Sequence, residues 1–184
     1  MSTRDAILRA TLKVIGEQGV AGLTNRRIVA DARVSLGTLT YHFPSQTELL
    51  RQAMLLFAEE ETAKLAAVVE AHGAENLSLE QAAALVEQVI QQLPFDTDEI
   101  APHELYLQAG RDPALRDATQ RCFAAYDELA LTILRALGVP EPERLAAPVV
   151  ALITGLQLRR LATGAPSTPT AESLMMLIRG AQST

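Results

Sequence analysis

Apolar side chains recur every three or four positions along most of this chain, which is the spacing of one face of an α-helix. The first stretch covers residues 3–18, where Thr3 can cap the start and Gly19 can end the helix. Its apolar face comprises Ile7, Leu8, Thr11, Leu12, Val14 and Ile15. No run of alternating apolar and polar residues is long enough to predict a strand. The pattern therefore predicts an all-α fold.

The same spacing, combined with capping residues, predicts further helices and a total of about nine. They cover residues 25–32, 35–42, 46–71, 79–93, 98–110, 113–137, 141–163 and 171–181. Ser45 with Glu48, and Ser78 with Gln81, have the spacing of a capping box, in which the two residues bind each other's backbone N–H groups. No continuous apolar run reaches 18 residues, so we expect no segment that spans a membrane.

Two short helices joined by a tight turn, at residues 25–32 and 35–42, have the form of a helix-turn-helix. Thr24 can cap the first helix, Ser35 can cap the second, and Ala32-Arg33-Val34-Ser35 form the turn between them. A helix-turn-helix places its second helix in the major groove of DNA. These residues therefore predict a protein that binds double-stranded DNA.

The side chains of this motif divide into core and DNA-facing positions. Leu39 and Phe43 lie four positions apart and are expected to face the core. The candidate DNA-binding residues are Thr24, Arg26, Arg27, Ser35, Leu36, Gly37, Thr38, Thr40, Tyr41 and His42. Thr24 and Ser35 either cap their helices only or also help to hold a phosphate at the helix N-terminus.

The candidates on the second helix suit different parts of DNA. Thr38 and Thr40 could touch a thymine methyl group or a base edge, whereas Tyr41 and His42 suit phosphates better. At Gly37 the absence of a side chain would permit a close approach to the groove, although glycine also weakens a helix. His42 could instead be a packing or solvent-exposed histidine.

The distribution of charge agrees with this interpretation. The chain has a net charge of −6, but residues 1–52 hold seven basic and four acidic side chains, a balance of +3. The remaining residues hold nine basic and eighteen acidic side chains, a balance of −9. The positive charge thus coincides with the DNA-binding motif. A balance of +3 is also found on ordinary surfaces, so charge alone leaves the matter open.

The composition limits the other classes of protein. A single cysteine, Cys122, excludes an internal disulfide and a multi-cysteine metal cluster, and it suits a reducing cytoplasm. We expect a cytoplasmic protein without a metal or cofactor. The sequence shows no metal-ligand spacing, Gly-rich phosphate loop or nucleophile elbow, so we expect no enzyme.

The motif region resembles the TetR family of bacterial transcriptional regulators. The resemblance covers about residues 4–55. It depends on Leu23-Thr24, Arg26-Arg27-Ile28, Ala30, Ala32, Val34-Ser35, Gly37, Leu39, Tyr41-His42-Phe43, Ser45 and Glu48-Leu49-Leu50. It implies an N-terminal helix-turn-helix DNA-binding domain, residues 1–48, and a C-terminal helical ligand-binding and dimerisation domain, residues 49–184. It also implies a homodimer on a near-palindromic operator, and release when a small molecule fills a pocket.

Three positions depart from the family pattern. Arg33 lies where the family usually has glycine in the turn, and it would be strained if that position needs a positive φ. Thr40 lies where an aromatic residue is common. Gln46, a further candidate DNA-binding residue, lies where a lysine often meets a phosphate. These differences put individual DNA contacts in question and leave the predicted fold unchanged.

In the family's layout, the helices at 46–71, 98–110 and 113–137 surround the ligand pocket. The resemblance therefore makes Met54, Phe57, Gln88, His103, Tyr106, Phe123 and Tyr126 candidate ligand-binding residues. The apolar members could instead be ordinary core residues, and the polar ones could simply be exposed. The ligand itself is unknown, and we expect an apolar or aromatic molecule.

Two apolar stripes near the C-terminus predict the subunit interface. They consist of Val149, Leu152, Ile153 and Leu156 on one helix, and Leu174, Leu177 and Ile178 on the next. Paired with the same helices of a second chain, they would form an intermolecular four-helix bundle, where Gly155 permits close approach. The alternative is that these residues fill an intramolecular core.

The most consistent interpretation is a homodimeric DNA-binding repressor that a small molecule releases from its operator. The alternative is a helical ligand-binding or protein-interaction module whose DNA binding is weak or lost. Sequence-specific binding that falls steeply with salt would separate the two.

Overall fold

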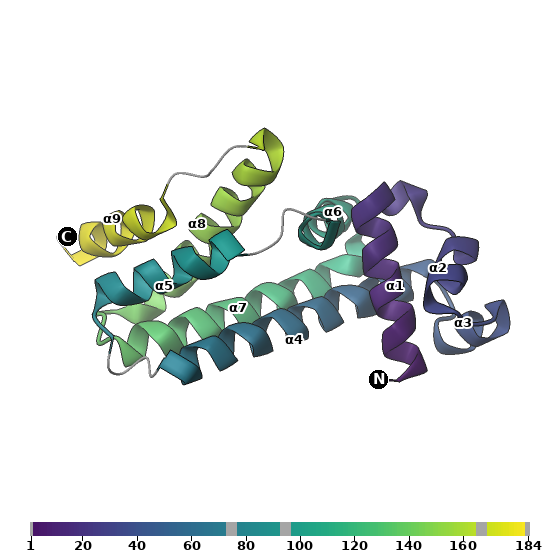
Figure 1. The fold of residues 1–184 in the computed structure, drawn as a ribbon, viewed down its shortest axis with the longest axis horizontal. Helices are drawn as coiled ribbons and strands as arrows, with labels where there is room; N and C mark the ends of the chain where they lie inside the picture. The colour runs from purple at the N-terminus through teal and green to yellow at the C-terminus, as the bar shows by residue number, and fades with distance from the viewer. Residues whose placement is uncertain (1, 73–76, 93–96, 165–168, 183–184) are drawn as a thin grey trace. The chain divides into compact units, whose positions relative to one another are not determined.

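The computed structural model describes residues 2–72, 77–92, 97–164 and 169–182, which form nine α-helices, two 3-10 turns and no strand. The helices are α1 Thr3–Gln18, α2 Asn25–Ala32, α3 Leu36–His42, α4 Gln46–His72, α5 Leu79–Gln92, α6 Thr97–Arg111, α7 Arg116–Ala136, α8 Pro142–Thr163 and α9 Thr170–Gln182 (Figure 1). The turns are η1 Val20–Gly22 and η3 Pro113–Leu115. The all-α fold expected from the apolar spacing is confirmed.

The chain divides into two compact units. The first comprises the described residues of 1–60 and 95–122, and the second those of 61–94 and 123–184. Helices α4 and α7 each begin in the first unit and continue into the second. The division into domains at residue 48 remains a prediction.

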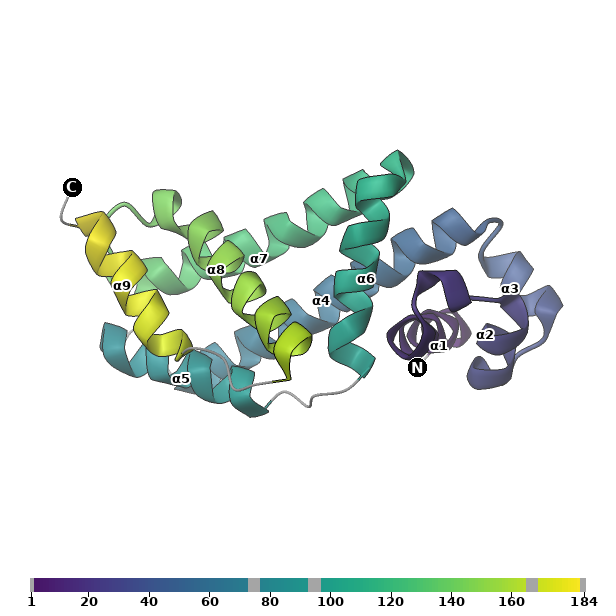
Figure 2. The ribbon, with the colours of Figure 1, turned by 90° about the horizontal axis from the view of Figure 1, so that it is seen from above.

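In the first unit, α2 lies beside α1, α3 packs on α2, and α6 crosses α1 (Figures 1 and 2). Large side chains from each of these helices, and from the first turns of α4, are buried between them. They include Ile7, Leu8, Ile15, Ile28, Leu39, Phe43, Leu49, Met54 and Leu105. Burial of each such side chain contributes about 1.5–3 kcal/mol, so this shared core fixes the orientation of the short helices α2 and α3.

Helix α1 begins with a capping box at Ser2, one residue before the expected cap Thr3. The Ser2 hydroxyl accepts the Asp5 N–H at 3.1 Å, and the Asp5 carboxylate accepts the Ser2 N–H at 3.3 Å. The cap is therefore Ser2, and the assignment to Thr3 was wrong. The reason is the spacing of the box, because an acidic side chain lies three residues after Ser2.

A short 3-10 turn that apolar spacing did not predict links α1 to α2. Gly19 ends α1 with φ 70°, a value that favours glycine. The Glu104 carboxylate of α6 then accepts the N–H of Val20 at 3.4 Å. A Cβ at Gly22 would lie 2.7 Å from the Cβ of Gln18, so only glycine fits there. The entry to the helix-turn-helix is thereby held against α6.

The second unit has its own core, in which α9 lies beside α5 and packs on α8 (Figure 2). This core contains Ala83, Ala130, Leu134, Val139, Leu145, Ala146, Val149, Leu174 and Ile178. Ser78 and Gln81 form the expected capping box, with bonds of 2.8 and 3.2 Å. Arg179 and Glu80 join α9 to α5 through an exposed ion pair at 2.8 Å.

Helix α8 is, among the described residues, the helix whose length and composition would suffice to cross a membrane. Its most apolar 18-residue window has a mean hydropathy of 1.3, and 22% of that window is buried. Leu145, Ala146 and Val149 of α8 lie in the core of the second unit. The helix thus contributes one side to this core, and its exposed residues include both apolar side chains and the charged Glu143, Arg144 and Arg159.

The start of α7 differs in detail from the expected helix. Asp112 caps a short turn, since its carboxylate accepts the Ala114 N–H at 3.0 Å. Pro113–Leu115 form a 3-10 turn, and the α-helix begins only at Arg116. Helix α6 also continues through Arg111, which had been assigned to the connecting turn. Asp112 and Pro113 therefore mark the junction correctly, although they do not open an α-helix directly.

Candidate DNA-binding surface

The helix-turn-helix is built on two capping residues. The Thr24 hydroxyl accepts the N–H of Arg27 at 3.4 Å at the start of α2. The Ser35 hydroxyl accepts the N–H of Thr38 at 3.1 Å at the start of α3. Both predicted caps are confirmed, and each leaves the first N–H groups of its helix exposed for an anion.

Between the helices, Arg33 adopts φ 55° and ψ 43°, the left-handed conformation. This conformation lets the N–H of Val34 reach the carbonyl of Val29 at 3.1 Å and closes the turn. The turn position therefore does need a positive φ, and Arg33 is strained there as expected. An arginine costs about 1–2 kcal/mol more than glycine in this conformation. The exposed guanidinium gives the turn a positive charge in return.

Helix α3 separates its buried and exposed faces cleanly. Leu39 and the capping residue Phe43 are buried against the first unit, as predicted. The opposite face carries Leu36, which is 54% exposed, and Tyr41, which is 84% exposed. Single exposed apolar residues are common on protein surfaces, but these two lie on the second helix of a helix-turn-helix, the helix that enters a DNA groove. This face is the natural candidate for contact with a DNA groove.

The remaining candidates of α3 and its flanks are placed around that face. Gly37, Thr40 and Gln46 are exposed, whereas Thr38 and His42 are partly buried. The His42 ring meets the Tyr41 ring edge to face, with 5.3 Å between their centres. This packing restricts both rings and favours a fixed position for Tyr41.

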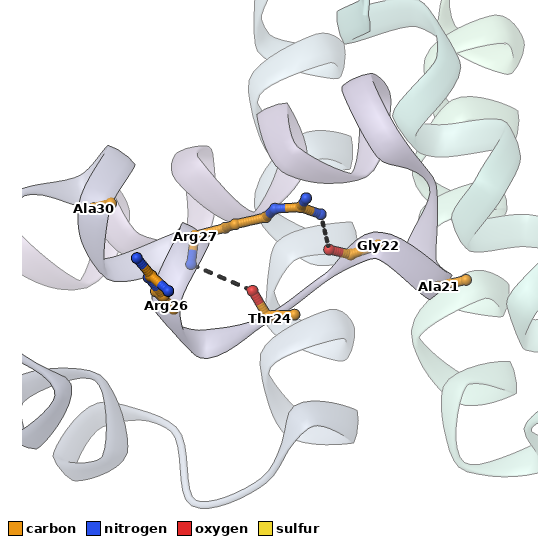
Figure 3. A pocket seen from close by; sticks show the side chains of 6 residues that line it. All are labelled: Ala21, Gly22, Thr24, Arg26, Arg27 and Ala30. Carbon is orange, nitrogen blue, oxygen red and sulfur yellow. Dashed lines mark hydrogen bonds between the residues drawn. The ribbon is translucent and has the colours of Figure 1, made fainter.

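A shallow depression borders the N-terminus of α2 (Figure 3). It is lined by Ala21, Gly22, Thr24, Arg26, Arg27 and Ala30. The Arg27 guanidinium is drawn back to the Gly22 carbonyl, 2.8 Å away, while Arg26 points in another direction (Figure 3). The two adjacent arginines therefore have different surroundings, as their 100° separation on a helix requires. The depression is positively charged and suits a phosphate.

A network of polar side chains connects α1, α3 and α4, and sequence patterns gave no sign of it. Glu48 accepts two bonds from Arg51, both at 2.8 Å, and one from Gln52 at 2.7 Å. Arg4 of α1 donates to the Gln52 side chain and lies over the ring of Phe43. The residue that ends the recognition helix is thus contacted by Arg4 of α1, which is itself bonded to α4.

This network changes the acidity of Glu48. The bidentate hydrogen bonds from Arg51 lower the pKa of the Glu48 carboxyl to about 2, with help from Gln52 and the positive charges of Arg51 and Arg4. Glu48 was expected to complete a capping box with Ser45. The Ser45 hydroxyl does accept the Glu48 N–H at 3.1 Å, but the Glu48 carboxylate is engaged with Arg51 and Gln52.

The candidate ligand-binding residues fall in both units. In the first unit, Met54 is buried and accepts a bond from the Thr119 hydroxyl at 3.2 Å, and the Tyr106 hydroxyl lies 3.5 Å from the sulfur of Cys122. The Nε2 atom of His103, also in this unit, is buried and makes no hydrogen bond in the described structure, while its Nδ1 atom lies 2.9 Å from the Glu99 carbonyl.

The other ligand candidates are less enclosed. Phe57 of the first unit is partly buried, as are Phe123 and Tyr126 of the second. Gln88 is exposed on α5. Within its own unit, Gln88 is therefore exposed, which was the alternative to a ligand-binding role for the polar candidates. Of the polar candidates, His103 has the clearest chemical reason to meet a ligand, because an unsatisfied buried nitrogen is costly.

The candidate interface residues also divide into two groups. Val149, Leu174 and Ile178 are buried in the core of the second unit. These three side chains therefore pack within their own chain, as the alternative to an interface expects, and their contribution to a subunit interface stays a prediction. Leu152, Ile153, Leu156 and Leu177 are only partly buried.

The structure adds two apolar residues that the stripes had missed. Leu158 on α8 is 51% exposed and Met176 on α9 is 61% exposed. Ala151, Gly155, Leu158 and Ala162 form an exposed, mostly small-residue face along α8. A Cβ at Gly155 would meet nothing within 4 Å, so packing within this chain does not require glycine there.

A helix-turn-helix joined to a second helical unit defines a transcriptional regulator that binds DNA. Residues 7–53 match the family described as bacterial regulatory proteins, tetR family, and residues 77–181 match the tetracyclin repressor-like, C-terminal domain. The chain therefore belongs to the TetR family of bacterial transcriptional regulators, and it is not an enzyme.

Individual relatives agree with this assignment. The chain is 27% identical over 170 residues to the HTH-type transcriptional regulator CymR of Pseudomonas putida, which covers 88% of this chain and 80% of CymR. It is 31% identical to the multidrug binding protein EbrR complexed with ethidium, with a TM-score of 0.75 and coverage of 96% and 98%. It is 30% identical to the TetR-family member SCO1917 of Streptomyces coelicolor A3, with a TM-score of 0.74 and the same coverage.

Proposed function

We propose that this protein is a cytoplasmic, homodimeric repressor that a small molecule releases from a palindromic operator. The observation that carries the proposal is the exposed face of α3, where Leu36 and Tyr41 stand in water on a helix whose opposite side is fixed in the core. A DNA groove is the partner that suits a recognition helix of this kind.

The DNA contacts follow from the chemistry of each position. Tyr41 and the partly buried His42 meet phosphates, as does Arg26, which extends from the depression at the start of α2. Thr24 and Ser35 contribute by capping, because each orients free N–H groups toward the DNA backbone. Arg33 adds a cation at the turn, and Arg27 acts by holding the turn through Gly22.

The proposed dimer joins α8 and α9 of one chain to α8 and α9 of its partner. Leu158 and Met176 supply exposed apolar area, and Leu152, Leu156 and Leu177 lie partly exposed nearby in sequence. Gly155 lets the helices approach closely. A two-fold dimer matches a palindromic site, with recognition helices about 34 Å apart.

The proposed ligand is an apolar or aromatic molecule with a hydrogen-bonding group. EbrR, at 29–31% identity, has been solved with ethidium, malachite green and proflavin. The buried Nε2 atom of His103 would meet the polar group of such a ligand. Met54, Phe57 and Tyr106 of the same unit would offer apolar and aromatic contact.

Release would proceed through α4. This helix begins three residues after Phe43, the cap of the recognition helix, and runs from the first unit into the second. A ligand that binds better to one orientation of α4 would shift the population away from the spacing that fits DNA.

The experiment that tests this function is operator binding by two variants of one residue. Genomic fragments bound by the purified protein are sequenced, and the enriched site is used as the probe. Tyr41→Ala is expected to weaken binding about ten-fold or more, because it removes a phosphate contact and ring area. Tyr41→Phe, which keeps the ring, serves as the matched control and should lose less. Equal affinity of Tyr41→Ala and the parent protein would contradict the proposed surface.

A further inference from the structure

The exposed face of the recognition helix α3 is largely apolar. Its exposed residues Leu36, Gly37, Thr40 and Tyr41 are spaced by one and four positions, so they share one side of α3. Leu36 has only carbon atoms in its side chain, and Gly37 has no side chain. A Cβ at Gly37 would meet only the Ser35 hydroxyl oxygen, at 3.7 Å, so the helix itself does not require this glycine.

The hydroxyl groups on this helix are used within it. The Thr40 hydroxyl donates to the carbonyls of Leu36 and Gly37, at 3.1 and 3.2 Å. The Thr38 hydroxyl lies 2.8 Å from the hydroxyl of Ser35. Because the oxygen of Thr40 is turned back to the helix, the methyl group is left as the outer end of this exposed side chain.

The sequence of the helix makes the same point independently. Residues 36–42 read LGTLTYH and include no Arg, Lys, Asn or Gln. These four residue types make the bidentate hydrogen bonds that identify guanine and adenine in the major groove. Thymine is recognised differently, since its C5 methyl group offers an apolar contact that unmodified cytosine, adenine and guanine lack.

We propose that this helix selects its operator by the C5 methyl groups of thymine, with Leu36 and the Thr40 methyl as the contacting groups. Gly37 provides the space that lets the helix approach closely enough for these short side chains to reach. The inference depends on the function proposed above, in which α3 enters the major groove. It goes further by naming the chemical group that is read and the residues that read it.

The test uses DNA that differs only in this methyl group. A random duplex library made with ordinary nucleotides is selected for binding, and the enriched duplex is then remade with deoxyuridine in place of thymidine. Removal of one buried methyl is expected to weaken binding about four-fold, and removal of a symmetry-related pair about fifteen-fold. Equal affinity for the thymidine and deoxyuridine duplexes would overturn the proposal.

Two substitutions at one position identify the protein side of the contact. Thr40→Ser removes the methyl and keeps the hydroxyl, so the affinity ratio between the two duplexes should fall. Thr40→Val keeps a methyl and removes the hydroxyl, so the ratio should persist. Leu36→Ala should also reduce the ratio. A ratio that is unchanged in both Thr40→Ser and Leu36→Ala would overturn the assignment of these residues.

The outcomes also separate this proposal from the one on which it depends. Enrichment of no sequence would contradict both the DNA-reading surface and the methyl readout. Enrichment of a sequence that binds equally well as thymidine and deoxyuridine duplexes would leave the regulator role intact and reject the methyl readout alone.

Discussion

The guanidinium of Arg4 lies 5.7 Å from the centre of the Phe43 ring, so the first helix of the chain holds the residue that ends the recognition helix. Phe43 is itself buried, and Arg4 also donates to Gln52 at the start of α4. One side chain thereby links three helices at the base of the DNA-binding surface.

Replacement of this arginine tests the link. Arg4→Met retains an unbranched, flexible side chain but removes the charge, the bond to Gln52 and the attraction to the ring of Phe43. The free energy of unfolding is expected to fall by about 1–2 kcal/mol, measured by urea denaturation. Arg9→Met is the matched control on the same helix. Its exposed ion pair with Glu60 should contribute less than about 1 kcal/mol, so an equal loss in both variants would count against the link.

The left-handed turn residue gives a prediction with opposite effects on stability and DNA binding. Arg33→Gly should raise the free energy of unfolding by about 1 kcal/mol, because glycine adopts φ 55° without steric cost. It should also lower the salt dependence of operator binding by about one unit of slope if the guanidinium meets a phosphate. Arg33→Ala removes the charge without relieving the backbone. Stabilisation by Arg33→Ala as large as that by Arg33→Gly would contradict this explanation.

A substitution of Gly37 in the recognition helix should likewise affect stability and DNA binding in opposite directions. Gly37→Ala should raise the free energy of unfolding by about 0.5–1 kcal/mol, since the position is helical and uncrowded. The added methyl group should weaken operator binding where the helix approaches DNA. Gly110→Ala, at an uncrowded helical position on α6, should give a comparable gain without an effect on DNA affinity. Unchanged operator affinity in Gly37→Ala would show that close approach is unnecessary.

The depressed pKa of Glu48 predicts a contribution to stability that depends on pH. The carboxyl titrates near 2 in the folded protein and near 4.5 without its partners. The charged form is therefore favoured by folding, so the stabilisation is complete above about pH 4.5 and is lost as the pH falls toward 2. Since the side chain is 33% exposed, solvent screening limits the effect to about 1 kcal/mol.

Glu48→Gln isolates this contribution. The variant should be less stable than the parent protein at pH 7, and the difference should shrink as the pH is lowered toward 2. Chemical denaturation at several pH values measures it. A difference that stays constant between pH 7 and pH 2.5 would mean that the charge of Glu48 does not contribute.

The exposed leucines of α8 and α6 offer a matched test of the proposed dimer. Leu158→Glu should convert the dimer to a monomer in analytical ultracentrifugation, because a charge would be buried in the α8–α9 interface. Leu107→Glu changes a leucine on α6 that is 61% exposed, against 51% for Leu158, and should leave the assembly unchanged. A monomeric parent protein, or dimers in both variants, would argue against this interface.

Helix positions could be predicted well from the sequence because capping residues and apolar spacing act locally. Thr24 and Ser35 illustrate this, since each bonds to a backbone group three residues away. Ser2 was overlooked in favour of its neighbour Thr3, yet the acidic residue at position 5 was a usable signal. The left-handed turn at Arg33 could be anticipated only from the resemblance, because an arginine does not itself indicate a positive φ.

The remaining features depend on contacts that no local pattern contains. Apolar spacing identified Val149 and Ile178 as members of a stripe, but spacing cannot distinguish a core within the chain from an interface between chains. The contact between Arg4 and Phe43 joins residues far apart in sequence. The Thr40 hydroxyl faces the helix because of its χ1 rotamer. The sequence does not reveal whether a threonine exposes its hydroxyl or its methyl group, so this feature is visible only in the structure.

The single cysteine of the chain, Cys122, allows local opening of the first unit to be measured by thiol labelling. Cys122 is 1% exposed, with the Tyr106 hydroxyl 3.5 Å from its sulfur. A thiol reagent can therefore reach the sulfur only while this part of the core is open. Since no second cysteine can react, the labelling rate of the native protein measures the frequency of that opening at one known position. A molecule or a DNA site that tightens the first unit would slow this labelling, without any engineered probe.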